Sequence, residues 1–139
     1  MKMRNTAIVS PQNVEIVQQI FDAFSKRDIN AALAAMHPEI EWVTPPGAPN
    51  PSWHGHDGVR SSLAEWAGSF DSFRLEPLEF TDTDNRVLVD VAMSVRGRGS
   101  DVDIQSHQFQ VWTLSEGKVV RMEMFSEKDE ALDAAGVRQ

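Results

Sequence analysis

Two histidines in a proline-rich stretch are the first residues whose spacing could support chemistry. The segment TPPGAPNPSWHGHDG, residues 44–58, places His54 and His56 one residue apart. A zinc site needs three or four converging ligands, and this pair supplies only two, so we predict no metal. An imidazole titrates near neutral pH, which makes His54 a candidate general acid or base. The alternative is that His54 packs this loop against the helix that follows.

Glu123 is a second candidate base, and its role depends on the register of one strand. In the string KVVRMEMFS, Glu123 lies between two methionines and alternates away from them. We expect Val120, Met122 and Met124 to face the interior and Glu123 to face solvent. A slip of one residue would exchange the two faces and bring Glu123 inside.

The composition indicates one acidic globular domain. The chain has 139 residues, 41% of them hydrophobic, and 13 Lys and Arg stand against 21 Asp and Glu for a formal net charge of −8. We predict a single domain over residues 1–139, with residues 1–10 as a flexible N-terminus. The charge disfavours nucleic acids and anionic membranes as partners. The chain has no cysteine, signal-peptide pattern or long apolar stretch, so we expect a cytoplasmic protein without disulfides.

The spacing of apolar residues predicts three helices early in the chain and one at its end. Ser10 and a following proline predict a helix start, and this first helix runs to about residue 27. Asp28 caps a short second helix, INAALAAM, that must stop before Pro38. A third helix covers about residues 58–70, and DEALDAAG forms a short closing helix with a glycine stop.

Alternation of apolar residues predicts the strands. A first strand covers residues 40–44, and we expect the proline-rich stretch after it to be a loop, because proline cannot donate to a central strand. Beyond residue 71 the chain alternates through four antiparallel strands, the third of which covers about residues 102–114. Helices followed by strands indicate an α+β fold in which the helices cover one face of a curved sheet.

Three strings span most of the chain: VEIVQQIFDAFSKRDINAALAAMHPEIEWVTP, WHGHDGVRSSLAEW and VWTLSEGKVVRMEMFSEKDEALDAAG. Together they resemble the SnoaL-like branch of the nuclear transport factor 2-like superfamily. The resemblance implies a cystatin-like cone, as in ketosteroid isomerases, in which a strongly curved mixed or antiparallel sheet wraps over three helices and encloses an apolar pocket. The superfamily includes isomerases, cyclases, dehydratases and non-catalytic proteins, so the fold does not fix the function.

The resemblance also implies where a ketosteroid isomerase carries its reactive groups. The base position falls on Thr44, which is a poor proton acceptor. The tyrosine position falls near Ile20, and the chain contains no tyrosine. The acid position falls on Gln110, or on Phe109 if the hairpin gap is placed differently. We therefore do not expect ketosteroid isomerisation, which needs all three groups.

Strand alternation predicts which side chains line the pocket. Trp42 shares its strand face with Ile40 and Thr44, and Trp112 shares its own with Gln108 and Gln110. Together with the methionines, these residues suit a flat, largely apolar ligand. The alternative is that these residues are plain core. The predicted ligand-binding residues are Phe21, Phe24, Trp42, Trp53, Trp66, Met93, Gln108, Gln110, Trp112, Met122 and Met124. The candidate catalytic residues are His54, Thr44 and Glu123.

Two functions remain open at this stage. The first is a SnoaL-like pocket protein that binds an apolar carbonyl- or hydroxyl-bearing metabolite, with or without a cofactor-independent isomerase, cyclase or dehydratase activity. The second is a non-catalytic ligand-binding or scaffold protein. We predict no cofactor. His107, Phe109 and Val111 share the face opposite the glutamines, and the apolar pair among them predicts a homodimer contact on the convex side.

Overall fold

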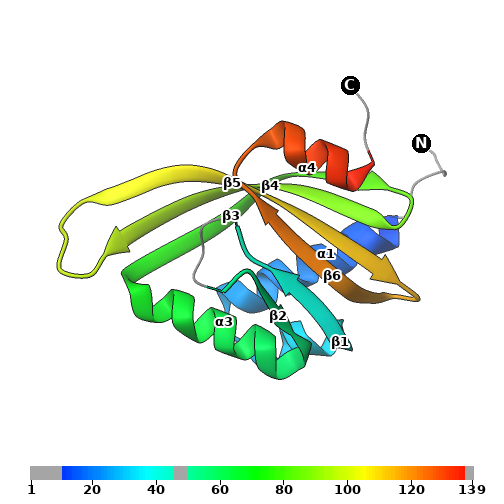
Figure 1. Cartoon of the computed structure of the whole chain (residues 1–139), viewed down its shortest axis with the longest axis horizontal. Helices are drawn as coiled ribbons and strands as arrows, with labels where there is room; N and C mark the ends of the chain where they lie inside the picture. Colours follow the sequence, from blue (N-terminus) through cyan, green and yellow to red (C-terminus); the bar gives the residue numbers. More distant parts are fainter. Residues whose placement is uncertain (1–10, 46–49, 137–139) are drawn as a thin grey trace.

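A strongly curved six-stranded sheet forms the frame of the molecule (Figure 1). The computed structural model describes residues 11–45 and 50–136. Its elements, in chain order, are α1 (Pro11–Ser25), α2 (Ile29–Ala34), β1 (Met36–Val43), β2 (Ser52–His54), α3 (Gly55–Ser69), β3 (Phe70–Thr83), β4 (Arg86–Gly97), β5 (Asp103–Ser115), β6 (Lys118–Phe125) and α4 (Lys128–Ala135). The strand order is β2-β1-β6-β5-β4-β3, and all neighbours are antiparallel except β1 and β6, which run parallel.

The sheet separates the helices into two layers. On its concave side α1 contacts β3 and β4, α2 contacts β1, and α3 contacts β1 and β3, whereas α4 lies on the outer side against β4, β5 and β6 (Figure 1). This arrangement confirms the predicted α+β fold, with three helices packed in a curved sheet and a short closing helix. None of the described helices is long and apolar enough to cross a membrane.

The first connection of the chain follows local capping rules. The Asp28 side chain accepts a hydrogen bond from the Ala31 backbone nitrogen at 3.1 Å, which confirms the predicted cap of α2. That helix ends at residue 34, two residues earlier than predicted, because Met36 already pairs with β6. Pro38 lies inside β1, where the pairing with β6 shifts register, so the strand accommodates a residue that has no backbone donor. The predicted cap at Ser10 lies outside the described residues.

The proline-rich stretch contains a short strand that the sequence did not predict. Residues 52–54 form β2, which pairs antiparallel with β1 and places Trp53 opposite Trp42. The expectation of a continuous loop was therefore wrong for these residues, although an edge strand is where neighbouring prolines are tolerated. The helix after it starts at Gly55 rather than Gly58. Gly55 has a φ of 74°, and a Cβ there would lie 3.2 Å from the Pro38 carbonyl oxygen, so the corner requires glycine.

A bulge in the last strand changes which valine reaches the core. Leu114 pairs with Val119 and Thr113 pairs with Arg121, so the residue between them on β6 has no partner of its own. Val119 and Met122 are both fully buried, whereas Val120 is half-buried. The prediction that Val120 shares the inner face was wrong, because strict alternation fails across a bulge.

The closing helix covers the outer face where a dimer contact was predicted. Leu88 and Val111 form a buried cluster there with Leu132 and two alanines of α4, and Phe109 packs against it. Gly136 ends this helix at a φ of 81°, as the sequence predicted. Helix α4 of the same chain therefore covers the apolar patch. The homodimer stays a prediction. The apolar pair that suggested it, Phe109 and Val111, packs against α4 and is not an exposed patch.

Candidate functional site

A chain of hydrogen-bonded polar side chains runs along the concave face of β5. Gln108, Gln110 and Trp112 point to that face, and their exposed fractions are 7%, 4% and 1%. The Trp112 indole nitrogen donates to Gln110 Oε1 at 3.1 Å, and Gln110 Nε2 donates to Gln108 Oε1 at 2.7 Å. We call these three residues the glutamine ladder. Two amides buried in an otherwise apolar core are unusual, because each polar atom needs a partner there.

Aromatic rings surround the deep end of the glutamine ladder. The Trp112 ring lies 5.8 Å from the Trp42 ring and 5.8 Å from the Phe21 ring, both edge-on. Trp42 is 3% exposed, and its indole nitrogen is buried without a hydrogen-bond partner among the described residues. A buried N–H group without an acceptor is rare in proteins. An acceptor atom on a bound ligand is one way in which this N–H could be satisfied.

The structure brings most of the predicted ligand-binding residues into one core. The main cluster contains Phe21, Trp42, Trp112 and Met122 as buried members and Phe24, Trp53, Met93 and Met124 as partly buried ones. Trp66 belongs to a different group, with its ring 4.8 Å from Phe70 and 5.9 Å from Phe73. Its indole nitrogen is also buried without a partner in the described part of the chain.

One aromatic residue of this core was not among the predicted ligand-binding residues. Phe80 packs edge-on against Phe21, with ring centroids 6.2 Å apart. The pairing of β3 with β4 shifts between Pro77 and Glu79, and this bulge brings Phe80 to the inner face. Pro77 was the available signal, because a proline inside a strand often accompanies a bulge.

The candidate catalytic residues lie outside the concave core. The His54 side chain is 69% exposed, and its Nε2 lies 3.2 Å from a carboxylate oxygen of Glu39. The Thr44 hydroxyl donates to the backbone carbonyl of Asn50. Glu123 pairs with Val111 across the sheet, which places it on the outer face, opposite Met122. The slipped register that would bring Glu123 inside does not occur.

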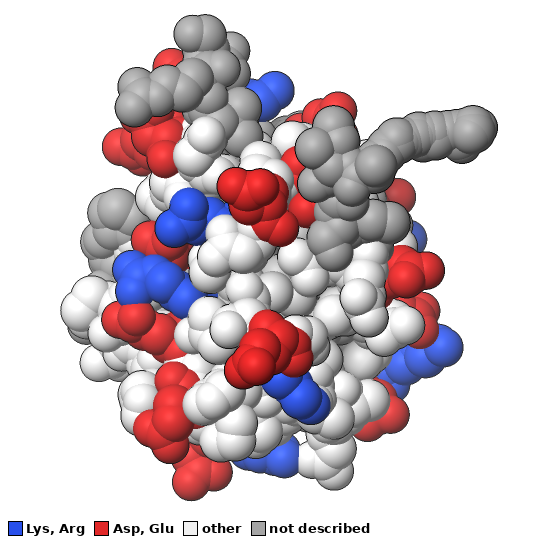
Figure 2. Space-filling view, turned by 90° about the vertical axis from the view of Figure 1, so that its right-hand side faces the viewer, with Lys and Arg blue, Asp and Glu red and all other residues white. Residues whose placement is uncertain are grey.

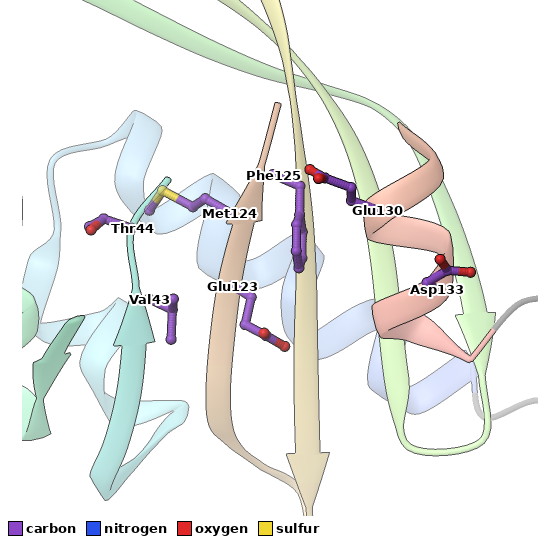
Figure 3. A pocket seen from close by; sticks show the side chains of 7 residues that line it. All are labelled: Val43, Thr44, Glu123, Met124, Phe125, Glu130 and Asp133. Atoms are coloured by element: carbon purple, nitrogen blue, oxygen red, sulfur yellow. The ribbon is translucent and has the colours of Figure 1, made fainter. Parts of the chain in front are cut away.

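Thr44 and Glu123 both line an outer hollow of about 400 Å³ instead (Figure 3). This hollow lies between helix α4 and the ends of β1 and β6. Its lining residues are Val43, Thr44, Glu123, Met124, Phe125, Glu130 and Asp133. Glu123 is already paired there, since Arg121 Nη2 lies 3.2 Å from its Oε2. The hydrogen bond and the charge of Glu123 raise the pKa of Arg121. The Glu123 carboxylate therefore forms an ion pair with Arg121 on the outer face.

The remaining histidines have structural partners. His56 Nε2 lies 3.0 Å from the Met36 backbone carbonyl, which ties the start of α3 to β1. His107 Nδ1 lies 2.9 Å from Asp90 Oδ1 on the outer face. In residues 11–45 and 50–136, no three His, Cys, Asp or Glu side chains group in a way that could hold a metal ion.

The surface is acidic, in line with the net charge. Figure 2 shows more acidic than basic side chains on the face that it presents, with the two kinds interspersed. Elsewhere on the surface, near the β4–β5 turn, Arg96 and Asp103 form an ion pair at 2.9 Å. On the described part of the face in Figure 2 the basic side chains do not merge into a continuous patch, so it does not resemble a phosphate-binding surface.

Comparison with known families agrees with the fold. A family profile described as a SnoaL-like domain matches residues 17–122. A search of curated proteins finds no match.

Solved structures of similar fold cover nearly the whole chain. TerC, co-crystallised with polyporic acid, is 28% identical with a TM-score of 0.78, over 90% of this chain and 98% of TerC. An NTF2-like protein of unknown function from Burkholderia pseudomallei K96243 is 25% identical with a TM-score of 0.78, over 88% and 95% of the two chains. A putative SnoaL-like polyketide cyclase from Jannaschia sp. CCS1 is 17% identical with a TM-score of 0.76, over 99% and 100%, a likeness of fold alone.

Proposed function

Because the chain belongs to the SnoaL-like domain family, we propose that it binds a small, largely apolar metabolite against the concave face of its sheet. The observation that carries the proposal is the glutamine ladder together with the buried indole nitrogen of Trp42, which has no hydrogen-bond partner in residues 11–45 and 50–136. The ligand we propose is flat and aromatic, with one or more polar oxygens.

The energetics of burial support this proposal. An unsatisfied buried donor costs about 1–3 kcal/mol, and an apolar side chain of the same shape avoids that cost. The neighbouring core residues are valines, methionines and aromatic rings, so two glutamines among them do not serve packing. A ligand oxygen that accepts from these donors would recover the lost hydrogen bond.

The ligand co-crystallised with TerC supports the proposed ligand class. Polyporic acid is an aromatic hydroxyquinone, so it combines aromatic surface with several oxygens. In this chain, aromatic rings from α1, β1 and β5 meet edge-on beside the buried glutamines. Aromatic rings beside a few polar groups are the composition typical of a small-molecule site.

An isomerase, cyclase or dehydratase is the alternative function. It requires a titrating group beside the ligand. His54 is exposed, and Glu123 lies on the outer face in an ion pair. The polar groups that we propose as ligand contacts are amides and indoles, which do not exchange protons near neutral pH. These placements favour binding without acid–base catalysis.

Calorimetric titration with polyporic acid tests the proposal. We expect saturable binding with one ligand per chain, and about 3- to 10-fold weaker binding by Trp42→Phe, which loses one hydrogen bond. Glu130→Gln with Asp133→Asn in the outer hollow is the matched control and should bind like the wild type. Absence of binding, or weakening by the control but not by Trp42→Phe, would contradict the proposal. Mass spectrometry of the ligand after incubation separates binding from turnover.

A further inference from the structure

The outer face of the sheet carries a histidine–aspartate pair that the proposed function does not use. His107 Nδ1 lies 2.9 Å from Asp90 Oδ1. A carboxylate can only accept a hydrogen bond, so Nδ1 carries the proton and Nε2 keeps its lone pair. Among the described residues Nε2 has no hydrogen-bond partner. The Asp90 side chain is 24% exposed and that of His107 is 55% exposed, so a largely buried carboxylate orients an imidazole that solvent molecules can reach.

A second hollow on the outer face, of about 280 Å³, lies beside this pair. It lies between α4 and strands β3, β4 and β5, and we call it the β4–α4 hollow. Its lining residues are Glu79, Thr81, Leu88, Asp90, Phe109, Lys128, Asp129 and Leu132. The two residues that His107 contacts both line it: Asp90 through the hydrogen bond, and Phe109 through a ring whose centroid lies 6.4 Å from the imidazole. His107 therefore lies at the rim of this hollow.

The apolar part of the lining suits a small aromatic molecule. Leu88 and Leu132 belong to the buried cluster under α4, and the ring of Phe109 packs against that cluster. Aromatic side chains bind other aromatic rings in offset or edge-on arrangements. The volume of the hollow is close to about 300 Å³, the lower end of the range for small-molecule sites. A single substituted ring is therefore the size of ligand that fits.

The charged part of the lining narrows the class further. Three carboxylates and one ammonium group line the hollow, those of Glu79, Asp90, Asp129 and Lys128. The excess of negative charge disfavours an anionic ligand, so the ligand we expect is uncharged. Lys128 supplies a positive charge that can stabilise an oxyanion as it forms.

We propose that the β4–α4 hollow hydrolyses small uncharged aryl esters, with His107 as the catalytic general base and Asp90 as its positioning residue. Nε2 of His107 takes a proton from a water molecule while the water oxygen bonds to the acyl carbon. The bond between the acyl carbon and the aryl oxygen then breaks, and the aryl oxygen receives the proton from Nε2. Ester and water give a carboxylic acid and a phenol, and the neutral imidazole is restored. Asp90 holds the productive tautomer and stabilises the imidazolium that forms in between.

Hydrolysis of 4-nitrophenyl acetate, followed by the absorbance of the released 4-nitrophenolate, tests the proposal. His54→Gln is the matched control, because His54 also faces a carboxylate and is 69% exposed, but it is a lining residue of neither hollow. We expect His107→Gln to lower the protein-catalysed rate by about tenfold or more, and His54→Gln to lower it by less than about twofold. Circular dichroism checks that both variants are folded. Hydrolysis no faster than in buffer, or equal losses in the two variants, overturns the proposal.

Asp90→Asn tests the positioning role separately. The side-chain amide of asparagine can donate to Nδ1, which leaves the ring proton on Nε2 and removes the lone pair that accepts the proton from water. We expect kcat to fall by about tenfold or more while KM stays within about twofold, because the aryl ester still contacts the same walls. An unchanged kcat in folded Asp90→Asn contradicts the role of Asp90.

This inference and the proposed function concern opposite faces of the sheet, so each can fail alone. Polyporic acid should bind to His107→Gln as it binds to the wild type. If polyporic acid binds but the wild type does not hydrolyse the ester, only the hydrolytic site is wrong. If the ester is hydrolysed through His107 but polyporic acid does not bind, only the proposed function is wrong.

Discussion

Replacing the middle residue of the glutamine ladder should destabilise the protein more than replacing its end. Gln110 is 4% exposed, accepts from Trp112 and donates to Gln108. Gln110→Met keeps a similar volume and removes both hydrogen bonds. The Trp112 N–H is then orphaned at a position that is 1% exposed, where water cannot replace the partner.

The magnitude follows from counting the orphaned groups. One deeply buried orphan costs about 1–3 kcal/mol. The Gln108 oxygen adds less, because its amide lies near the exposed end of the face and can turn toward water. We expect Gln110→Met to lower the free energy of unfolding by about 2 kcal/mol. Gln108→Met leaves the Trp112 bond intact and orphans the Gln110 amide nitrogen alone, so it should cost less, about 1 kcal/mol.

Guanidinium unfolding followed by tryptophan fluorescence measures both changes. The double variant should lose less stability than the sum of the two single variants, by about 0.5 kcal/mol or more, since the ladder bond between the glutamines is lost in each. A Gln110→Met protein as stable as the wild type, or a larger loss in Gln108→Met, would refute the reasoning. The first result would mean that the ladder bonds do not contribute to stability, and the second that the Trp112 bond is not the one that contributes most.

Two further predictions concern the closing helix and the pH dependence of binding. Leu132→Ala removes a side chain of α4 that is 8% exposed and should cost about 2–4 kcal/mol in the same unfolding assay, whereas Leu78→Ala, at a position 52% exposed, should change stability by less than about 0.5 kcal/mol. Similar effects of the two substitutions would mean that α4 does not cover the outer face in solution. Ligand affinity measured by calorimetry should stay constant between about pH 6 and 9, because the proposed contacts are amides and indoles. A titration of affinity in that range would indicate an ionising group at the site and favour the enzymatic alternative.

Local sequence signals accounted for much of the fold. The cap at Asp28 and the stop at Gly136 were readable because each involves neighbours within one turn of helix. The shared face of Gln108, Gln110 and Trp112 was readable because β5 has no irregularity across these positions in its pairing with β4. Both kinds of prediction depend only on residues close together in the chain.

Part of the candidate site was beyond such signals. The bulges at Val120 and Leu78 shift the alternation by one residue, and only the one at Leu78 has a local signal, the neighbouring Pro77. The unexpected strand β2 forms by pairing with β1 at the edge of the sheet, where Trp53 lies opposite Trp42. Pairings of this kind join segments that the sequence alone does not align.

By itself the sequence determined the order of the main helices and strands, the family resemblance and the set of aromatic and amide side chains available for a ligand. The tertiary structure decided how these groups face one another. It covered Val111 with α4, turned Glu123 outward into an ion pair, and bonded Trp112 to Gln110. The physical reason is that periodicity fixes the face of a side chain within its own strand, whereas hydrogen-bond partners and burial depend on the register between strands and on packing across the sheet.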